Sequence, residues 1–144
     1  MKKTFKKDDV PQIAKEIVAS LKSGESATVV ALMGDLGAGK TTLTQAIALE
    51  LGIQENVISP TFVIMKSYPI TGGTHEKLVH IDAYRLHGGH ELLKLGWSEL
   101  IADPKNLVFI EWPERVFDII PGTANSVSLT HISEEERGIE SNID

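Results

Sequence analysis

The chain has 144 residues, no cysteine and a formal net charge of −6. This length suits one domain with one hydrophobic core and leaves no room for a separate substrate domain. The lack of cysteine excludes disulfides, thiolate nucleophiles and cysteine-ligated zinc, and the negative charge argues against a protein that grips nucleic acid by itself.

The basic start of the chain, residues 1–7, is followed by Asp8 and Asp9, where a signal peptide would need its apolar stretch. We therefore interpret this start as a solvated tip. No run of residues approaches the roughly 18 apolar residues of a membrane helix. A chain without cysteine is compatible with a reducing compartment, so we expect a cytoplasmic protein that does not contact a membrane.

The first predicted helix begins near Asp9 and Pro11 and is closed by Gly24. Asp can cap free backbone N–H groups, and Pro fits the first helical turn. Apolar residues then recur at helical spacing, at Ile13, Ile17, Val18 and Leu21. The next segment, 28–33, is short and almost wholly apolar, which is typical of a strand buried on both faces of a parallel sheet.

A second helix is predicted from about Lys40 to Leu51, with Gly52 as its stop. Two strands at 62–68 and 77–81 follow, and their polar, glycine-containing connection predicts an antiparallel hairpin.

The last third of the chain adds short helical pieces broken at Gly96, an apolar strand at 107–110 and an alternating strand at 126–132. Strands and helices interleave, which predicts an α/β fold. We expect a three-layer sandwich with a mixed, mostly parallel sheet and an antiparallel hairpin. Residues 1–133 would form a single domain, and residues 134–144 a loose, polar, acidic tail.

Residues 34–41 read G-D-L-G-A-G-K-T and match the phosphate-loop pattern G-x-x-x-x-G-K-[ST]. The glycines let the backbone turn sharply and expose consecutive N–H groups, and the helix that follows adds the positive end of its dipole. Lys40 would meet the β- and γ-phosphates, Thr41 would offer a hydroxyl to Mg²⁺, and Thr42 would lie near the α-phosphate. The predicted nucleotide-binding set is Gly34, Asp35, Leu36, Gly37, Ala38, Gly39, Lys40, Thr41 and Thr42.

This loop stands between an apolar strand and a helix, which is the context that a nucleotide-binding loop requires. We therefore expect the sandwich to be of the P-loop NTPase type and residues 1–133 to form a single P-loop ATPase domain. A glycine-rich turn without a ligand is the alternative.

Two carboxylates end neighbouring apolar runs and are candidates for the second contribution to Mg²⁺ that such a loop needs. Glu111 ends the run 107–110 and is the first choice for the metal, together with Thr41. Asp82 ends the run 78–81 and would bind Mg²⁺ through water or orient the attacking water. The alternatives are structural, with Asp82 capping the turn that follows it and Glu111 pairing with Arg115.

The segment Ser59, Pro60, Thr61 and Phe62 offers two hydroxyls beside a rigid proline just before a strand. It fits either a switch that senses the γ-phosphate or a plain strand-entry turn. The five histidines show no zinc-binding spacing. Core packing is the better interpretation of Trp97, whereas Trp112 is a candidate contact for a base or a partner.

Taken together, these segments resemble the bacterial TsaE (YjeE) family, the P-loop ATPases of tRNA threonylcarbamoyladenosine (t6A) biosynthesis. The resemblance covers roughly residues 5–132, and the segments that carry it, in the family's order, are Gly34–Thr42, Ser59–Phe62, His80–Leu86, Leu95–Leu100 and Phe109–Glu114. It implies ATP and Mg²⁺ as ligands, with Lys40, Thr41 and Thr42 on the Mg-nucleotide.

The resemblance also implies that Glu111 completes the metal site and that Asp82 supports hydrolysis. Residues 59–62 would form the nucleotide-sensitive switch, and Trp112 would lie near the active site. Adenine would be contacted near the first helix and the C-terminal end, although no motif indicates by which residues.

In function, the resemblance implies an accessory ATPase that is weak alone and stimulated by the threonylcarbamoyl transferase subunits of the TsaD and TsaB type. Together they would modify adenosine 37 of tRNAs that read ANN codons, and the chain would meet tRNA only through that complex.

Two alternative functions stay open on the residues alone. A small-molecule P-loop kinase usually closes an arginine-bearing lid over the transferred phosphate, and only three scattered arginines exist here, Arg85, Arg115 and Arg137. A nucleotide-sensing adaptor that scarcely hydrolyses ATP would share the same residues. A GTPase is disfavoured, because the sequence has no N-K-x-D guanine motif.

Overall fold

The computed structural model describes residues 1–35, 37–58, 64–71 and 73–143. Within these ranges the strands form one seven-stranded sheet in the order β1-β7-β6-β2-β5-β4-β3. The strands are β1 (Lys2–Lys6), β2 (Thr28–Met33), β3 (Met65–Pro69), β4 (Lys77–Asp82), β5 (Asn106–Glu111), β6 (Asn125–His131) and β7 (Glu136–Ser141).

The middle of the sheet is parallel, since β2 pairs with both β5 and β6, and β4 pairs with β5, in parallel register. Antiparallel strands flank it: β3 on β4 at one side, and β7 on β6 followed by β1 on the other. This confirms the α/β prediction and the hairpin of 62–68 with 77–81, although residues 62 and 63 lie outside the described ranges.

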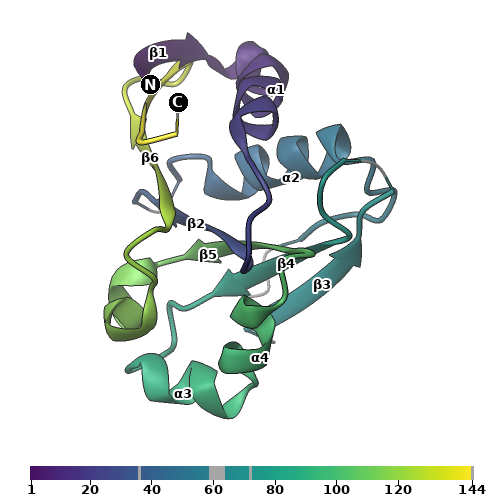
Figure 1. Ribbon diagram of the computed structural model, residues 1–144. Coiled ribbons are helices and arrows are strands. Elements are labelled where there is room, and N and C mark those ends of the chain that lie inside the picture. The colour runs from purple at the N-terminus through teal and green to yellow at the C-terminus, as the bar shows by residue number, and fades with distance from the viewer. Residues whose placement is uncertain (36, 59–63, 72, 144) are drawn as a thin grey trace.

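Helices cover both faces of the sheet, which gives the three layers (Figure 1). On one face lie α1 (Val10–Ser20) and α2 (Lys40–Glu50), and on the other lie α3 (Gly89–Lys94), α4 (Trp97–Ala102) and the 3-10 helix η2 (Pro113–Ile119). A short 3-10 helix, η1 (Lys7–Asp9), precedes α1.

Alternation along the apolar strands divides the core between these two faces. In β2, Val30 and Leu32 belong to the cluster under α1 and α2, whereas Val29 and Ala31 belong to the cluster under α3 and α4. Trp97 is 2% exposed in the second cluster, so its interpretation as a core residue is confirmed.

The two ends of the chain differ from the prediction. The start is not a free tip, because residues 2–6 form β1, and the end is not a loose tail, because residues 136–141 form β7 between β1 and β6. Phe5 and Ile139 supply the reason: each is buried in the core cluster under α1 and α2, at 8% and 2% exposure. The partition into a domain 1–133 and a tail 134–144 is therefore wrong at this boundary.

The limits of α1 also need correction. Asp9 stands at the N-cap position but its side chain makes no capping hydrogen bond, and the helix ends at Ser20 rather than near Gly24. The other helix predictions are confirmed: α2 is followed by Gly52 at φ 78°, and Gly96 at φ 93° separates α3 from α4. Among the described residues, no helix has the length and apolar character needed to span a membrane.

Candidate nucleotide-binding site

The glycine-rich loop connects β2 to α2, as predicted, and its backbone needs glycine. Gly34, Gly37 and Gly39 have φ values of 150°, 81° and 103°, which side-chain-bearing residues rarely adopt. A Cβ on Gly34 would lie 2.8 Å from the carbonyl oxygen of Leu129 in β6. The helix then starts at once, with the N–H of Leu43 donating to the carbonyl of Gly39 at 2.9 Å.

A hollow of about 530 Å³ opens beside this loop at the carboxyl ends of the parallel strands. Of the predicted nucleotide-binding set, Gly37, Gly39, Lys40, Thr41 and Thr42 line it, and both predicted carboxylates and Trp112 join them. Gly34 and Asp35 do not line it, Ala38 lines a neighbouring hollow, and Leu36 lies outside the described residues. Ser59, Pro60, Thr61 and Phe62 also lie outside them, so the switch stays a prediction.

Lys40 has a buried ammonium group that meets no hydrogen-bond acceptor among the described residues. The residue is 6% exposed, and its Nζ lies 3.9 Å from the centre of the Trp112 ring, on which the cation rests. A buried cation is costly unless it is paired, and an aromatic face offsets only part of that cost. The ammonium group therefore fits an anionic ligand such as a phosphate chain.

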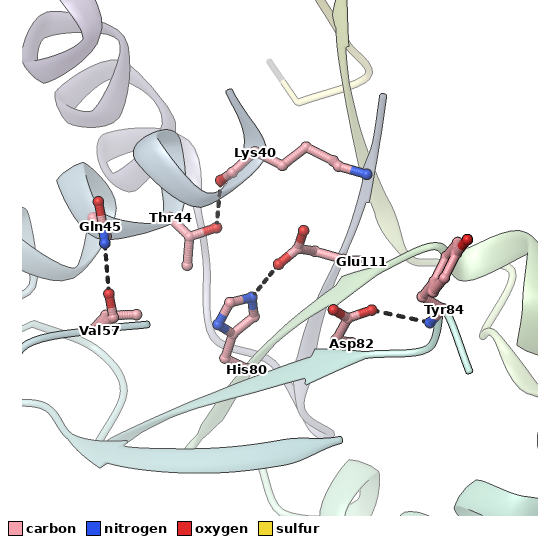
Figure 2. A network of polar contacts seen from close by, with 8 residues as sticks. All are labelled: Lys40, Thr44, Gln45, Val57, His80, Asp82, Tyr84 and Glu111. Carbon is pink, nitrogen blue, oxygen red and sulfur yellow. Dashed lines mark hydrogen bonds and ion pairs between the residues drawn. The ribbon is translucent and has the colours of Figure 1, made fainter. Parts of the chain in front are cut away.

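The two predicted carboxylates lie side by side. Asp82 and Glu111 are the last residues of β4 and β5, they are register partners, and they are 6% and 4% exposed. Figure 2 shows both side chains at these strand ends, near Lys40. The carboxyl ends of neighbouring strands thus bring Asp82 and Glu111 together, although each was predicted from its own apolar run.

Both carboxylates accept hydrogen bonds from the protein. The backbone N–H of Tyr84 donates to Asp82 Oδ1 at 3.0 Å, so the turn-capping role considered for Asp82 is real and coexists with its place in the site. Glu111 Oε2 accepts from His80 Nε2 at 2.6 Å, and no ion pair of Glu111 with Arg115 occurs in the described part of the chain.

No group of three or more histidine, aspartate or glutamate side chains in the described ranges could hold a metal ion by itself. In nucleotide sites, Mg²⁺ usually takes one or two protein oxygens and completes its shell with phosphates and water. Glu111, Asp82 and the hydroxyl of Thr41 are oxygen donors of this kind, so the residues present fit a magnesium ion carried by the nucleotide.

Trp112 packs between the buried ammonium of Lys40 and the exposed side chain of Tyr84. Its ring lies 5.1 Å from that of Tyr84 at an interplanar angle of 58°, and the guanidinium of Arg115 lies 5.3 Å from the Tyr84 ring. Trp112 also has φ 57°, a left-handed backbone that is uncommon for a bulky residue and is found most often at functional sites.

Four residues of this neighbourhood were missed from the sequence: Lys7, Tyr84 and Arg137, which line the hollow, and His80, which binds Glu111. His80 precedes Asp82 by two residues in β4, so strand alternation could have indicated that both side chains share one face. Tyr84 lies in the turn that follows the strand, where this alternation does not apply. Lys7 and Arg137 gave no signal, since they reach the site only through the pairing of β1 with β7.

A second hollow of about 210 Å³ adjoins the first on the side of the chain ends. It combines apolar and charged side chains from the loop, from both termini and from β6: Phe5, Lys7, Asp8, Val10, Ala38, Gly39, Thr42, Leu43, Leu129 and Arg137.

Comparison with known proteins decides the family. A family model described as "Threonylcarbamoyl adenosine biosynthesis protein TsaE" matches residues 4–139. The chain belongs to the TsaE family.

Individual TsaE proteins agree with this over most of their length. The chain is 37% identical to the tRNA threonylcarbamoyladenosine biosynthesis protein TsaE of Haemophilus influenzae, over 81% of this chain and 70% of that one. It is 34% identical to the Bacillus subtilis protein, over 95% and 81%, and 39% identical to the Streptomyces coelicolor protein, over 72% and 66%.

A solved TsaE-like structure has the same fold. The crystal structure of Bacillus subtilis YdiB superimposes with a TM-score of 0.74 at 27% sequence identity, covering 100% of this chain and 87% of that one. The overall fold seen here is therefore shared with YdiB.

Proposed function

We propose that this TsaE-family protein binds and hydrolyses Mg-ATP as an accessory ATPase in the threonylcarbamoylation of tRNA. The observation that carries the proposal is the buried ammonium of Lys40 at a phosphate loop, which has no hydrogen-bond partner among the described residues and lines the same hollow as the carboxylates of Asp82 and Glu111. A cation and two carboxylates arranged in this way are complementary to the phosphates and the metal ion of Mg-ATP.

The phosphates would lie across the loop and the start of α2. The strained glycines present backbone N–H groups there, and the Lys40 ammonium would move from the Trp112 ring to the β- and γ-phosphate oxygens. Thr41 and Glu111 would hold Mg²⁺, which supplies positive charge at the phosphates when it is bound.

The adenine would enter the smaller hollow. That hollow shares Lys7, Gly39, Thr42 and Arg137 with the larger one, so one ligand can extend through both. Phe5, Val10 and Leu129 give it the apolar surface that a base requires. The nucleotide would then lie between the loop and the two chain ends.

In hydrolysis, a water oxygen bonds to the γ-phosphorus while the bond to the β–γ bridging oxygen breaks, leaving ADP and inorganic phosphate. Asp82 would orient that water, because its carboxylate stands beside Glu111 and its Oδ1 is fixed by the Tyr84 N–H. We expect slow turnover by the isolated protein.

The proposed partners are the threonylcarbamoyl transferase subunits of the TsaD and TsaB type, with tRNA met through that complex. The net charge of −6 supports the indirect contact with tRNA, since a direct reader of phosphates is usually basic. The exposed Tyr84 and Arg115, which stack outward from Trp112, give the nucleotide site a route to a partner surface.

Two measurements test this function. ATP hydrolysis is expected to be weak for the protein alone and to rise clearly when the transferase subunits and tRNA are added. Depletion of the protein in cells should remove threonylcarbamoyladenosine from tRNA, as read by mass spectrometry of nucleosides, and a Lys40→Ala copy should not restore it. A normal nucleoside level after full depletion would refute the proposed role, and no hydrolysis under any condition would favour a nucleotide-sensing adaptor.

A further inference from the structure

His80 is a buried histidine that no step of the proposed reaction uses. It lies in β4 two residues before Asp82, so its side chain points to the same face of the sheet as those of Asp82 and Glu111. It is 0% exposed, and its Nε2 lies 2.6 Å from Glu111 Oε2.

The direction of this hydrogen bond follows from the chemistry of the two groups. An ionised carboxylate only accepts, so His80 carries its proton on Nε2 and donates it to Glu111. The other ring nitrogen, Nδ1, is buried and has no hydrogen-bond partner in the described part of the chain. The bond to Glu111 is thus the one polar interaction seen for the imidazole.

A histidine kept only for packing is expected to be satisfied on both nitrogens, or replaced by an apolar side chain that loses nothing on burial. His75 shows the satisfied arrangement in this same protein: its Nε2 lies 2.8 Å from Thr28 Oγ1 and its Nδ1 lies 3.0 Å from Thr74 Oγ1. His80 differs, because only its Nε2 has a hydrogen-bond partner among the described residues. That partner is Glu111, a proposed magnesium ligand.

A glutamate side chain has three rotatable bonds, and holding it in one orientation costs conformational entropy. The His80 bond occupies Oε2 and leaves Oε1 for another partner. In Figure 2, His80 and the side chain of Lys40 lie on different sides of Glu111, so the histidine supports the carboxylate from the side opposite the lysine.

We propose that His80 is a positioning residue, which holds the Glu111 carboxylate in the orientation that meets Mg²⁺ on the bound nucleotide. This inference rests on the proposed function. It concerns how well the protein distinguishes Mg-nucleotide from metal-free nucleotide, not whether the loop binds phosphate.

The test compares ATP affinity with Mg²⁺ and with EDTA, by calorimetry, in three variants. His80→Leu removes the donor, His80→Gln keeps an N–H group at the reach of Nε2, and His75→Leu removes a buried histidine outside the site. Partners that orient metal ligands are typically worth 10–100-fold in metal affinity, so we expect His80→Leu to lose about tenfold of the gain that Mg²⁺ gives.

Metal-free ATP should bind His80→Leu within about twofold of wild type, because the contacts of the loop to phosphate remain. His80→Gln should recover most of the Mg²⁺ gain, and His75→Leu should keep all of it. Adding His80→Leu to a Glu111→Gln background should cause no further loss, since the histidine acts through that carboxylate.

An unchanged Mg²⁺ gain in folded His80→Leu would overturn the inference. If that variant does not fold, His80→Gln and His80→Asn replace it, because the amide of asparagine is too short to reach Glu111; equal Mg²⁺ gains in these two would overturn it as well. Wild-type protein that binds no ATP would instead contradict the proposed function itself, so the two failures are distinguishable.

Discussion

Buried polar side chains lie at both ends of the parallel strands, which we call the amino-terminal and carboxyl-terminal edges of the sheet. The two edges differ in whether these side chains have hydrogen-bond partners. At the amino-terminal edge, His75 Nε2 donates to Thr28 Oγ1, Thr28 Oγ1 donates to the carbonyl of Lys22, and Thr74 Oγ1 donates to His75 Nδ1. At the carboxyl-terminal edge, the buried Lys40 Nζ and His80 Nδ1 have no hydrogen-bond partner among the described residues.

This difference separates a structural from a functional polar cluster. Folding favours burial of polar groups that satisfy one another, as at His75, and disfavours the arrangement around Lys40 unless a ligand completes it. We therefore expect substitutions in the polar cluster of His75 to change stability, and substitutions in the polar cluster around Lys40 to change binding and hydrolysis.

The largest effect should come from Asp82→Ala. A positioned general base or water-orienting group is typically worth 10²–10⁴-fold, so we expect ATP hydrolysis in the presence of the partners to fall by about 100-fold, and ATP affinity by less than about threefold. Glu111→Ala should show the opposite balance, with a weakened gain from Mg²⁺ in binding. Single-turnover hydrolysis and calorimetry separate the two, and reversed results would mean that the roles of the carboxylates are exchanged.

A glycine at each edge gives the second prediction. Gly34→Ala would place a Cβ 2.8 Å from the Leu129 carbonyl oxygen at φ 150°, and we expect it to lower the free energy of unfolding by about 2 kcal/mol. Gly24→Ala, at the other edge, meets nothing within 4 Å and should change it by less than about 0.5 kcal/mol. Urea unfolding measures both, and equal effects would contradict the geometry of the loop.

The smallest effect concerns pH at the structural edge. Burial lowers the pKa of His75 below its ordinary 6.5, so the folded protein binds this proton more weakly than the unfolded chain. Between the lowered pKa and 6.5 the unfolded state binds more protons, so this contribution to stability is complete above pH 6.5 and is lost as the pH falls below it. The difference in free energy of unfolding between wild type and His75→Gln should therefore be constant above pH 6.5 and shrink as the pH falls below 6.5. A difference that does not change with pH would refute this prediction.

What the sequence could predict follows the same division between local and distant interactions. The glycine-rich loop, the strands that end at Asp82 and Glu111, and the helix after Lys40 all depend on residues close in sequence, and each was predictable. The pairing of β1 with β7 joins the two ends of the chain, and Phe5 and Ile139, which drive it, are single apolar residues among charged ones.

Because this pairing joins distant segments, part of the candidate site could not be predicted from the sequence. Lys7 and Arg137 reach the hollows because β1 and β7 are neighbours, and no motif marks either residue. The bond of His80 to Glu111 likewise joins two strands and could be anticipated only after their register was known. Site residues that belong to a local motif could therefore be predicted from the sequence, whereas site residues that arrive through contacts between distant segments could not.

The central claim is that the Lys40 ammonium, which has no hydrogen-bond partner among the described residues, binds the phosphates of ATP. One calorimetric titration with Mg-ATP tests it. We expect Lys40→Ala to bind at least tenfold more weakly than wild type, about 1.4 kcal/mol, while its free energy of unfolding falls by less than that, because the buried ammonium meets the Trp112 ring but no hydrogen-bond acceptor among the described residues. Unchanged affinity for Mg-ATP in folded Lys40→Ala would contradict the account.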